Sequence, residues 1–350
     1  MTLSITSDRP PARRRSYRSR HPLVTFVARR VLIGIVLLVV VSFLVFLAMN
    51  LLPGDAARAM LGPKASAEQV ATVHRQLGLD RPLLERYWSY LLGLAHGDLG
   101  ASLTGSANPF ADASSAVAQT QVSSIIAVPA RNTLVLGVLS VIILIPLSLL
   151  LGVAAGVRPG SMVDRLISNA TLAGLSVPDF IMGMLLILVF AVKLHWLPPA
   201  SLLAPDVSPL SEPQILVLPV ATLVLVSLGF TTRQVRAGVV RAMRSDYVEM
   251  ARLNGIPESQ VVWRWGLRNA IAPAIQSFAQ IVGYLLGGVV LVEFVFSYPG
   301  IGYGLVQYVS ARDLPTVQSV TVLIAAIYIG LNIVADLLVI LVVPRLRTAQ

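Results

Sequence analysis

Residues 246–273 read DYVEMARLNGIPESQVVWRWGLRNAIAP, a charged and amphipathic segment that lies between two long apolar runs. Asp246 can act as a helix N-cap because its carboxylate can accept from the free amides of a first turn, and Glu249 stands three residues later, as in a capping box. Gly255 can end the helix because glycine adopts the left-handed conformation without a steric clash. The segment therefore predicts a helix of about two turns up to Gly255 and a second helix over residues 257–269.

The first of these helices is amphipathic. Several of its residues recur at helical spacing and share one face, which comprises Tyr247, Met250, Ala251 and Asn254. Glu249 and Arg252 point elsewhere. A helix of two turns is marginal alone in water, so its stability must come from packing against something else. We therefore expect another protein to hold it; the alternative is an ordinary amphipathic helix in a long loop.

The string EMARLNG, from Glu249 to Gly255, resembles the E-A-A-x-x-x-G signature of permease subunits in binding-protein-dependent ABC importers. The wider strings SDYVEMARLNG and LRNAIAP are most similar to the oligopeptide and dipeptide branch of that family. In many members a leucine and a proline follow the glycine at a fixed offset. Here Leu267 stands at the leucine position, Arg268 replaces the proline, and the proline comes later, at Pro273. This departure weakens the general match and favours the peptide branch, which shares it.

The resemblance implies a transport subunit whose motor is a separate chain. In the family the short helix docks in a groove of the ATPase, which implies docking residues at Asp246, Tyr247, Glu249, Met250, Ala251, Asn254 and Gly255. It also implies a type I ABC importer fold, a second related permease, two ATPase subunits that bind the ATP, and an external substrate-binding protein. Short peptides, either dipeptides or oligopeptides, are the implied cargo, and a nickel complex or another small solute is the alternative.

The composition independently indicates an all-α membrane protein. Of the 350 residues, 55% are hydrophobic and 13% are charged, which is not typical of a soluble globular domain. Cysteine is absent, so the chain has no disulfide framework and no thiolate site. The net charge of +10 could suggest a nucleic-acid partner, but the arginines gather in the first thirty residues and between apolar runs. That distribution is typical of a membrane protein and excludes nucleic acid as the expected partner.

Six apolar stretches are long enough to cross a hydrocarbon core of about 30 Å as helices. They cover residues 31–52, 133–157, 166–192, 215–232, 274–296 and 317–343. An even number of spans puts both termini on the same side of the membrane. The arginine-rich connections predict that this side is cytoplasmic and that the membrane is the cell membrane (inner or plasma). The expected parts are a cytoplasmic arm over residues 1–30, a permease domain over 31–345 and a cytoplasmic tail over 346–350.

The arginine-rich arm and the external segment are the parts whose roles the sequence leaves open. The arm can bind anionic membrane lipid or be disordered, and a cleaved signal peptide is disfavoured because its apolar run is too long. The external segment covers residues 53–131 and contains LDRPL and GDLG, strings that resemble the N-terminal half of peptide permeases. Its Ala- and Ser-rich run over 105–124 can contact the binding protein or be a tolerated insertion.

Polar residues inside a membrane span are costly and often functional. Asp179 lies well inside the third span and directly follows Pro178, whose ring should kink the helix. A broken helix that carries a carboxylate near the membrane midplane indicates a substrate pathway; a neutral or paired aspartate is the alternative. Glu293 and Asp336 lie nearer the ends of their spans, where carboxylates can bend out to water, and structural roles are expected for both.

Glycines at four-residue spacing predict close helix contacts, at Gly152 with Gly156 and at Gly283 with Gly287 and Gly288. Enzymatic motifs are missing from the sequence. It has no G-x-x-x-x-G-K-[ST] phosphate loop, no G-x-S-x-G elbow and no paired histidines with metal-ligand spacing. We therefore expect no enzymatic activity, no cofactor and no metal site. The competing interpretation is an ion-coupled secondary transporter or channel, which would use Asp179 and leave the docking segment without a role.

Overall fold

The computed structural model describes residues 22–51, 66–76, 80–102, 120–204, 207–311 and 313–342. The arginine-rich arm up to residue 21, most of the 105–124 run and the 346–350 tail lie outside these ranges. The described chain is mostly helical, and its only strands are β1 (Ala101–Ser102) and β2 (Thr120–Gln121), which pair antiparallel with Ala101 opposite Gln121. The predicted all-α architecture is confirmed.

The helices fall into a first and a second half of the chain. The first half contains α1 (Pro22–Leu51), α3 (Ala67–Gln76), α4 (Leu83–Ala95), α5 (Val122–Val157), α6 (Met162–Leu175), α7 (Asp179–Leu186) and the π-helical η1 (Ile187–Lys193). The second half contains the 3-10 turn η2 (Pro209–Ser211), α8 (Pro213–Met243), α9 (Asp246–Leu253), α10 (Glu258–Gln260), the π-helical η3 (Val261–Gly266), α11 (Leu267–Val295), α12 (Ile301–Ser310) and α13 (Leu314–Val342).

Among the described residues, four helices are unbroken and both long and apolar enough to cross a membrane, namely α1, α5, α8 and α13. A fifth candidate is a bent pair, because α6 and the α7–η1 helix meet at 105°. In the place of the remaining predicted span, 274–296, the chain forms α11, whose described apolar part covers Gly283–Val295. Multiple spans are therefore present, and their number of six stays a prediction.

The helix α8 is the centre of the bundle and packs against α5, α6 and α11. Its apolar window is mostly buried, whereas only a minor part of the windows of α1, α5 and α13 is buried, as expected for helices that face lipid. Gly152 and Gly156 of α5 allow the close approach to α8, since a Cβ atom at Gly152 would lie 2.6 Å from Val235 and one at Gly156 would lie 2.7 Å from Val239. The predicted role of these two glycines in helix contact is confirmed.

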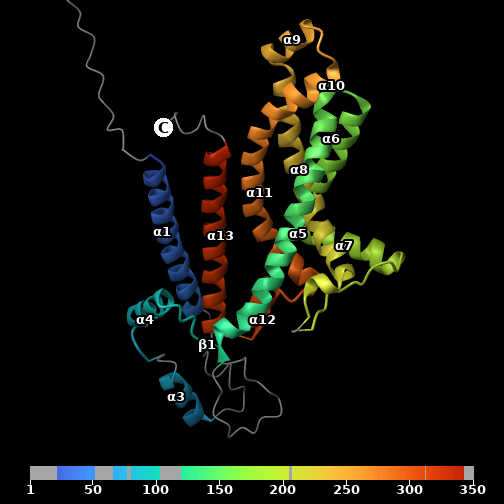
Figure 1. Ribbon diagram of the computed structural model, residues 1–350. Coiled ribbons are helices and arrows are strands. Elements are labelled where there is room, and N and C mark those ends of the chain that lie inside the picture. The colour runs from blue at the N-terminus through green and yellow to red at the C-terminus, as the bar shows by residue number, and fades with distance from the viewer. Residues whose placement is uncertain are drawn as a thin grey trace, which may run out of the picture.

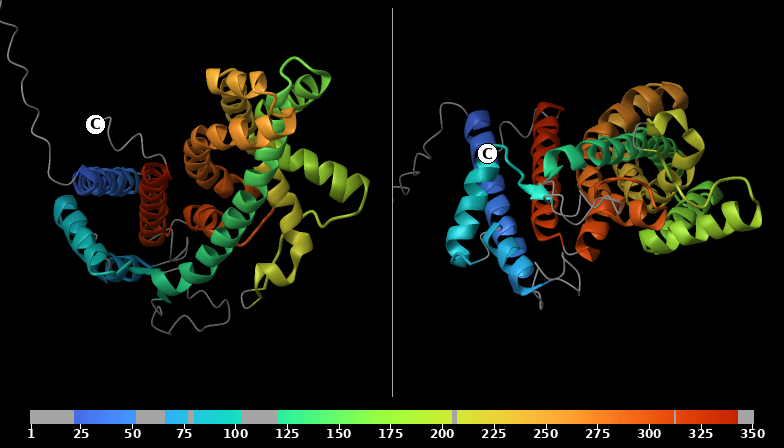
Figure 2. Two further views of the ribbon diagram at one scale, coloured as in Figure 1. Left: turned by 45° about the horizontal axis from the view of Figure 1, so that its top comes forward. Right: turned by 90° about the horizontal axis from the view of Figure 1, so that it is seen from below.

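The two ends of the bundle carry different elements (Figure 1). The short helix α9 lies at one end, together with the start of α1 and the end of α13, whereas α4 and β1 lie at the opposite end. Two views in Figure 2 show α1 and α13 side by side, and α13 also packs against α11 of the central group. An ion pair of 3.1 Å joins Arg30 of α1 to Asp336 of α13, which confirms a structural role for Asp336.

The structural role expected for Glu293 is confirmed, but its carboxylate does not reach water at the end of its span. Its side chain is fully buried and accepts from the hydroxyl of Thr133 at 2.5 Å and from the backbone amide of Gly302 at 2.7 Å. The Thr133 hydroxyl in turn accepts from the amide of Ile301 at 2.8 Å. Glu293 therefore caps α12 from a different helix, because the free amides of that helix would otherwise be buried without partners.

Candidate functional site

The short helix predicted in residues 246–255 is confirmed as α9 (Asp246–Leu253). Its start differs from the prediction, because Ser245 occupies the N-cap position with extended backbone and Asp246 is the first helical residue. The Ser245 hydroxyl donates to the carbonyl of Ala242 at 2.5 Å and caps nothing in α9. Asp246 and Glu249 both lie in the first turn, where negative charge is favoured by the helix dipole.

The helix ends as predicted, at Gly255. This glycine has φ = +74°, and its amide donates to the carbonyl of Arg252 at 2.9 Å. The next amide, of Ile256, donates to the carbonyl of Ala251 at 3.2 Å. Together these two bonds form a Schellman motif, which satisfies carbonyl groups at the end of the helix.

One face of α9 is buried and a second is exposed. Val248 and Ala251 are buried against apolar residues of α8 and of the chain after α9, which are Val235, Val239, Ala242, Met243, Val261 and Phe278. The exposed face carries Met250, which is 61% exposed, with Tyr247, Leu253 and Asn254 around it. The prediction that Ala251 shares the exposed face is wrong, because both faces carry apolar residues and only packing decides which of them turns inward.

The predicted second helix, over residues 257–269, does not end where expected. A short turn of α10 leads through the π-helical segment η3 directly into α11, so the chain is helical from Glu258 to Val295. Gly266 keeps a helical backbone, unlike Gly255, and nothing stops the helix at residue 269. Arg252 bridges back from α9 to Glu258 of α10 with bonds of 3.1 and 2.7 Å, and its guanidinium lowers the pKa of the Glu258 carboxyl.

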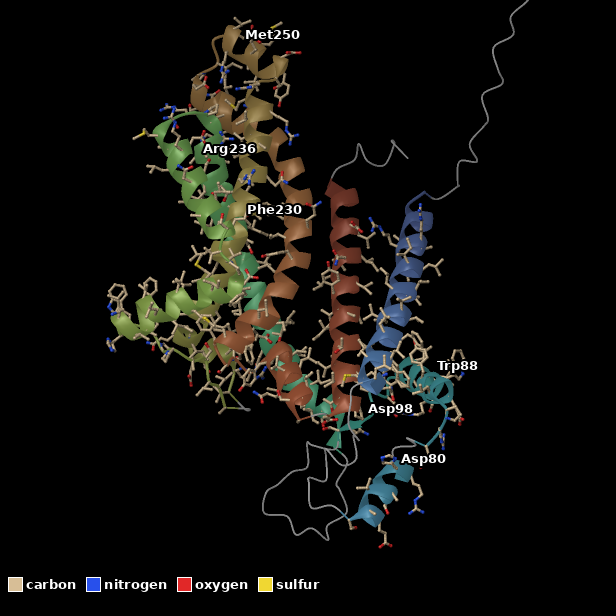
Figure 3. The ribbon with its side chains drawn as sticks, turned by 180° about the vertical axis from the view of Figure 1, so that it is seen from behind. Asp80, Trp88, Asp98, Phe230, Arg236 and Met250 are labelled. Carbon is tan, nitrogen blue, oxygen red and sulfur yellow. The ribbon has the colours of Figure 1, made fainter. Side chains whose placement is uncertain are left out.

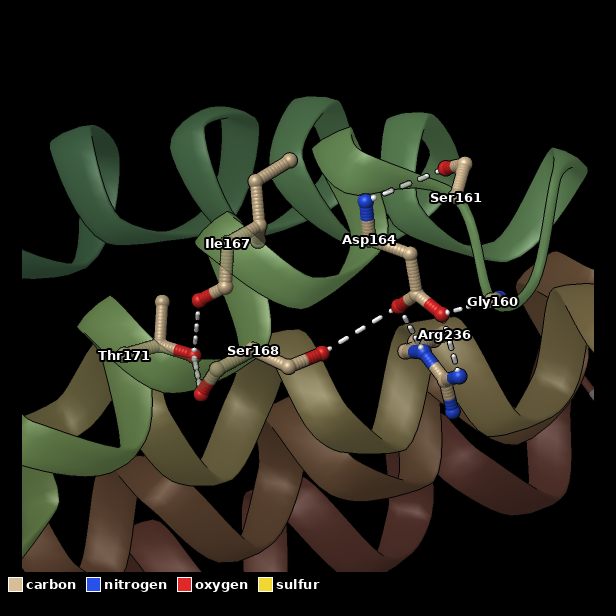
Figure 4. A network of polar contacts seen from close by, with 7 residues as sticks. All are labelled: Gly160, Ser161, Asp164, Ile167, Ser168, Thr171 and Arg236. Atoms are coloured by element: carbon tan, nitrogen blue, oxygen red, sulfur yellow. Dashed lines mark hydrogen bonds and ion pairs between the residues drawn. The ribbon is translucent and has the colours of Figure 1, made fainter.

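A partly buried ion pair lies where α8 leads toward α9 (Figure 4). The Nε and Nη2 atoms of Arg236 donate to Oδ1 and Oδ2 of Asp164 at 2.5 and 2.7 Å. The same carboxylate accepts from the amide of Gly160 at 2.7 Å and from the Ser168 hydroxyl at 3.2 Å. Sequence reasoning missed this pair. The Ser161-x-x-Asp164 spacing was a signal for the helix start, since the Asp164 amide donates to the Ser161 hydroxyl, but not for the partner on α8.

Beside this pair, α6 and α8 enclose a groove of about 690 Å³. Its lining is mixed, with Ser168, Asn169, Leu172 and Leu175 from α6 and Phe230, Arg233, Gln234, Arg236 and Ala237 from α8. Figure 3 shows Phe230 and Arg236 along α8 on the way to Met250 of α9. The groove therefore lies on the stretch of α8 that leads to the short helix.

The predicted kink at Pro178 is a complete break. Pro178 precedes α7, and Asp179 is the first residue of that helix, at the corner where the chain turns by 105°. Asp179 is half-buried and faces α11, where its carboxylate lies near Tyr284. A Cβ atom at Gly288 would lie 2.9 Å from the Asp179 Oδ2 atom. The carboxylate thus lies at the junction of α7 and α11, on different elements from the α9 site.

Two family descriptions match this chain. Residues 148–348 match "Binding-protein-dependent transport system inner membrane component", and residues 23–137 match the corresponding N-terminal description of such membrane components. The chain belongs to this permease family. It is a multi-pass membrane protein and a transport subunit rather than an enzyme, and the resemblance drawn from residues 249–255 is confirmed.

Relatives named as permease proteins match nearly the whole chain. It is 36% identical over 325 residues to the glutathione transport system permease protein GsiC of Escherichia coli strain K12, and equally to that of Salmonella typhimurium strain LT2. Each alignment covers 93% of this chain and 99% of the relative. A permease of a binding-protein-dependent ABC system works with ATPase subunits and a substrate-binding protein, which confirms these two kinds of partner in general terms.

Proposed function

We propose that this permease takes up short peptides, either dipeptides or oligopeptides, which an external binding protein delivers. The support is the peptide-branch resemblance of residues 245–273 together with relatives named for the transport of glutathione, itself a short peptide. A nickel complex or another small solute is the alternative cargo. Family membership favours ATP-driven import over the ion-coupled alternative.

The observation that carries the mechanism is the exposed face of α9. Apolar side chains such as Met250 and Leu253 stand in solvent on a helix whose other face, at Val248 and Ala251, is already packed. An apolar helix face of this kind fits a groove in another protein. In our proposal that protein is the ATPase, and the docking surface comprises Asp246, Tyr247, Glu249, Met250, Leu253 and Asn254, with Ala251 and Gly255 fixing the helix in place.

Motion of α9 would reach the membrane helices through two rigid connections. The first is the unbroken helical path from α10 into α11. The second is α8, which the Asp164–Arg236 pair clamps to α6. Because α6 turns into α7 at Asp179, a displacement of α9 by the closing ATPase dimer would move that corner and give alternating access. Pro178 and Asp179 are therefore our candidates for the substrate pathway.

We further propose that a second, related permease completes the assembly and that both termini face the cytoplasm. The start of α1, the end of α13 and α9 lie at the same end of the bundle, which supports this topology (Figure 1). The ATP would be bound by the ATPase subunits, and this chain would need no cofactor of its own.

The test compares Met250→Glu with Leu210→Glu in the full complex. Both side chains are 61% exposed, but Leu210 lies in η2 at the opposite end of α8. We expect Met250→Glu to lower the amount of ATPase that co-purifies by roughly tenfold, as for a residue at the centre of an interface. Leu210→Glu should leave it unchanged. Full retention of the ATPase by Met250→Glu would overturn the docking proposal.

The cargo is tested separately, with the assembled complex and its binding protein in vesicles. We expect ATP-dependent uptake of labelled dipeptides or glutathione. Uptake of nickel without peptide uptake would establish the alternative cargo, and uptake by the isolated chain without ATP would overturn the importer mechanism itself.

A further inference from the structure

The helix α4, in the segment expected to be external, has three distinct faces. Tyr87 is buried against α1. Glu85 and Ser89 form a polar exposed edge. The third face is an exposed apolar stripe at positions one turn apart, which comprises Leu84, Trp88 and Leu92. Leu84 is 75% exposed and Trp88 is 60% exposed, and Figure 3 shows Trp88 pointing away from the bundle.

The contacts of Tyr87 fix the level at which α4 meets α1. The Tyr87 hydroxyl lies 2.9 Å from the hydroxyl of Ser42 and donates to the carbonyl of Val39 at 3.0 Å. Its ring also packs against Phe43 and Phe46, with centroid separations of 5.2 and 5.4 Å. These partners lie in the second half of α1 but not at its end, so the Tyr87 side chain contacts α1 well before the C-terminal end of that span.

The neighbouring residue, Arg86, contacts α1 nearer to its C-terminal end than Tyr87 does. Its Nη1 atom donates to the Asn50 side chain at 2.9 Å. At 1.5 Å per residue, Ser42 lies roughly 16 Å and Asn50 roughly 28 Å along the axis from Val31, where the apolar run begins. Since the hydrocarbon core is about 30 Å thick, Asn50 and Arg86 stand at its far border and Tyr87 extends inside it.

We propose that α4 lies within the membrane leaflet at the C-terminal end of α1, with Leu84, Trp88 and Leu92 against the lipid acyl chains. The stripe continues the lipid-facing surface of α1, where Phe43 and Leu44 are also exposed. A water-soluble protein docked on the stripe would have to enter the hydrocarbon core, so lipid is the occupant that fits. The second permease lies in the same membrane and is the occupant that the test must separate from lipid. Glu85 and Ser89 face the headgroups, and a tryptophan at this depth is typical of interfacial anchoring. The inference holds for either orientation of the chain.

The test uses single-tryptophan variants of the full chain, assembled with its partners and reconstituted into phosphatidylcholine vesicles. One variant keeps Trp88 and the matched control keeps Trp263, which is 67% exposed beside α9; the other tryptophans are changed to phenylalanine. Fluorescence is quenched either by lipids brominated on the acyl chain or by iodide in the water. Because such a helix lies at interfacial depth, we expect bromolipid to quench Trp88 at least roughly twofold more strongly than Trp263. Iodide should quench Trp263 more strongly than Trp88.

Equal quenching of Trp88 and Trp263 by iodide, with none by bromolipid, would overturn the proposal and place α4 in water. Protection of Trp88 from iodide only after the binding protein is added would overturn it as well, since the stripe would then be a protein interface. Shielding of Trp88 from both iodide and bromolipid would place the second permease on the stripe and would also overturn the proposal. A second test changes Leu84 and Leu92 to Asp in the variant that keeps Trp88. Charges on the stripe should draw α4 out of the hydrocarbon core, so bromolipid quenching of Trp88 should fall and iodide quenching should rise. Unchanged quenching by both would contradict a lipid contact.

Discussion

Asp164 of α6 and Arg236 of α8 are joined by two parallel hydrogen bonds of 2.5 and 2.7 Å, and Asp164 is almost fully buried. This geometry is the strong, bidentate form of an arginine–carboxylate pair. Arg236 lies on the last turns of α8 before α9, so the pair ties the helix that carries the docking segment to the helix that breaks at Pro178.

Changing Asp164 to Asn should destabilise the permease and weaken coupling between ATP hydrolysis and uptake. The change leaves Arg236 without its ion pair, and we expect a loss of about 2 kcal/mol, because a charged group loses its partner in a mostly buried site. Thermal unfolding of the purified complex measures the first effect, and the ratio of ATP hydrolysed to solute transported measures the second.

Glu258→Gln is the matched control for Asp164→Asn. It removes the charge of a second bidentate pair, with Arg252, but both partners there are exposed, so the expected loss is about 0.5 kcal/mol or less. Equal losses in the two variants would show that the Asp164–Arg236 pair is not a structural clamp.

Gly255→Ala should weaken the end of α9. The residue has φ = +74°, a conformation that costs an L-residue about 1 kcal/mol. No atom lies within 4 Å of a Cβ built there, so the cost is conformational and not steric. Co-purification of the ATPase measures the result. Gly255→Asn should recover part of the binding, because asparagine tolerates this conformation, and identical losses for Ala and Asn would contradict the explanation.

Gly288→Ala should impair transport by displacing Asp179. The added Cβ atom would lie 2.9 Å from the Asp179 Oδ2 atom, so the carboxylate must move. We expect slower uptake with normal ATPase assembly, and the same outcome for Asp179→Asn. Gly287→Ala is the control, since its Cβ atom would meet nothing within 4 Å. Normal uptake by both Gly288→Ala and Asp179→Asn would remove Asp179 from the pathway.

Gly152→Ala should separate α5 from α8. The new Cβ atom would lie 2.6 Å from the Val235 side chain, and overpacking of this kind costs about 2 kcal/mol. Gly137 lies in the same helix with open space around it, so Gly137→Ala should change stability by roughly 0.5 kcal/mol in the opposite direction. The two melting temperatures, compared in the same detergent, check the prediction. A shift of the same sign in both variants would contradict it.

Much of the site could be predicted because its rules act over a few residues. The end of α9 at Gly255 follows from glycine chemistry, and the break before Asp179 follows from the ring of Pro178. The predicted N-cap at Asp246 was wrong by one residue, because Ser245 before it is an equally good candidate and occupies that position. The Ser245 hydroxyl donates to the carbonyl of Ala242 in α8. The family resemblance could be drawn from residues 249–255 because the features that define this string, a short helix and its glycine end, are local.

The amino-acid sequence by itself determined that this chain spans a membrane several times and that a short capped helix interrupts its second half. Only the tertiary structure decided that Ala251 turns inward and Met250 outward, that Asp164 finds Arg236, and that Glu293 caps α12 instead of reaching water. The physical reason is that apolar length and helix-end chemistry are local, whereas the partner of a buried side chain depends on which distant helices pack together.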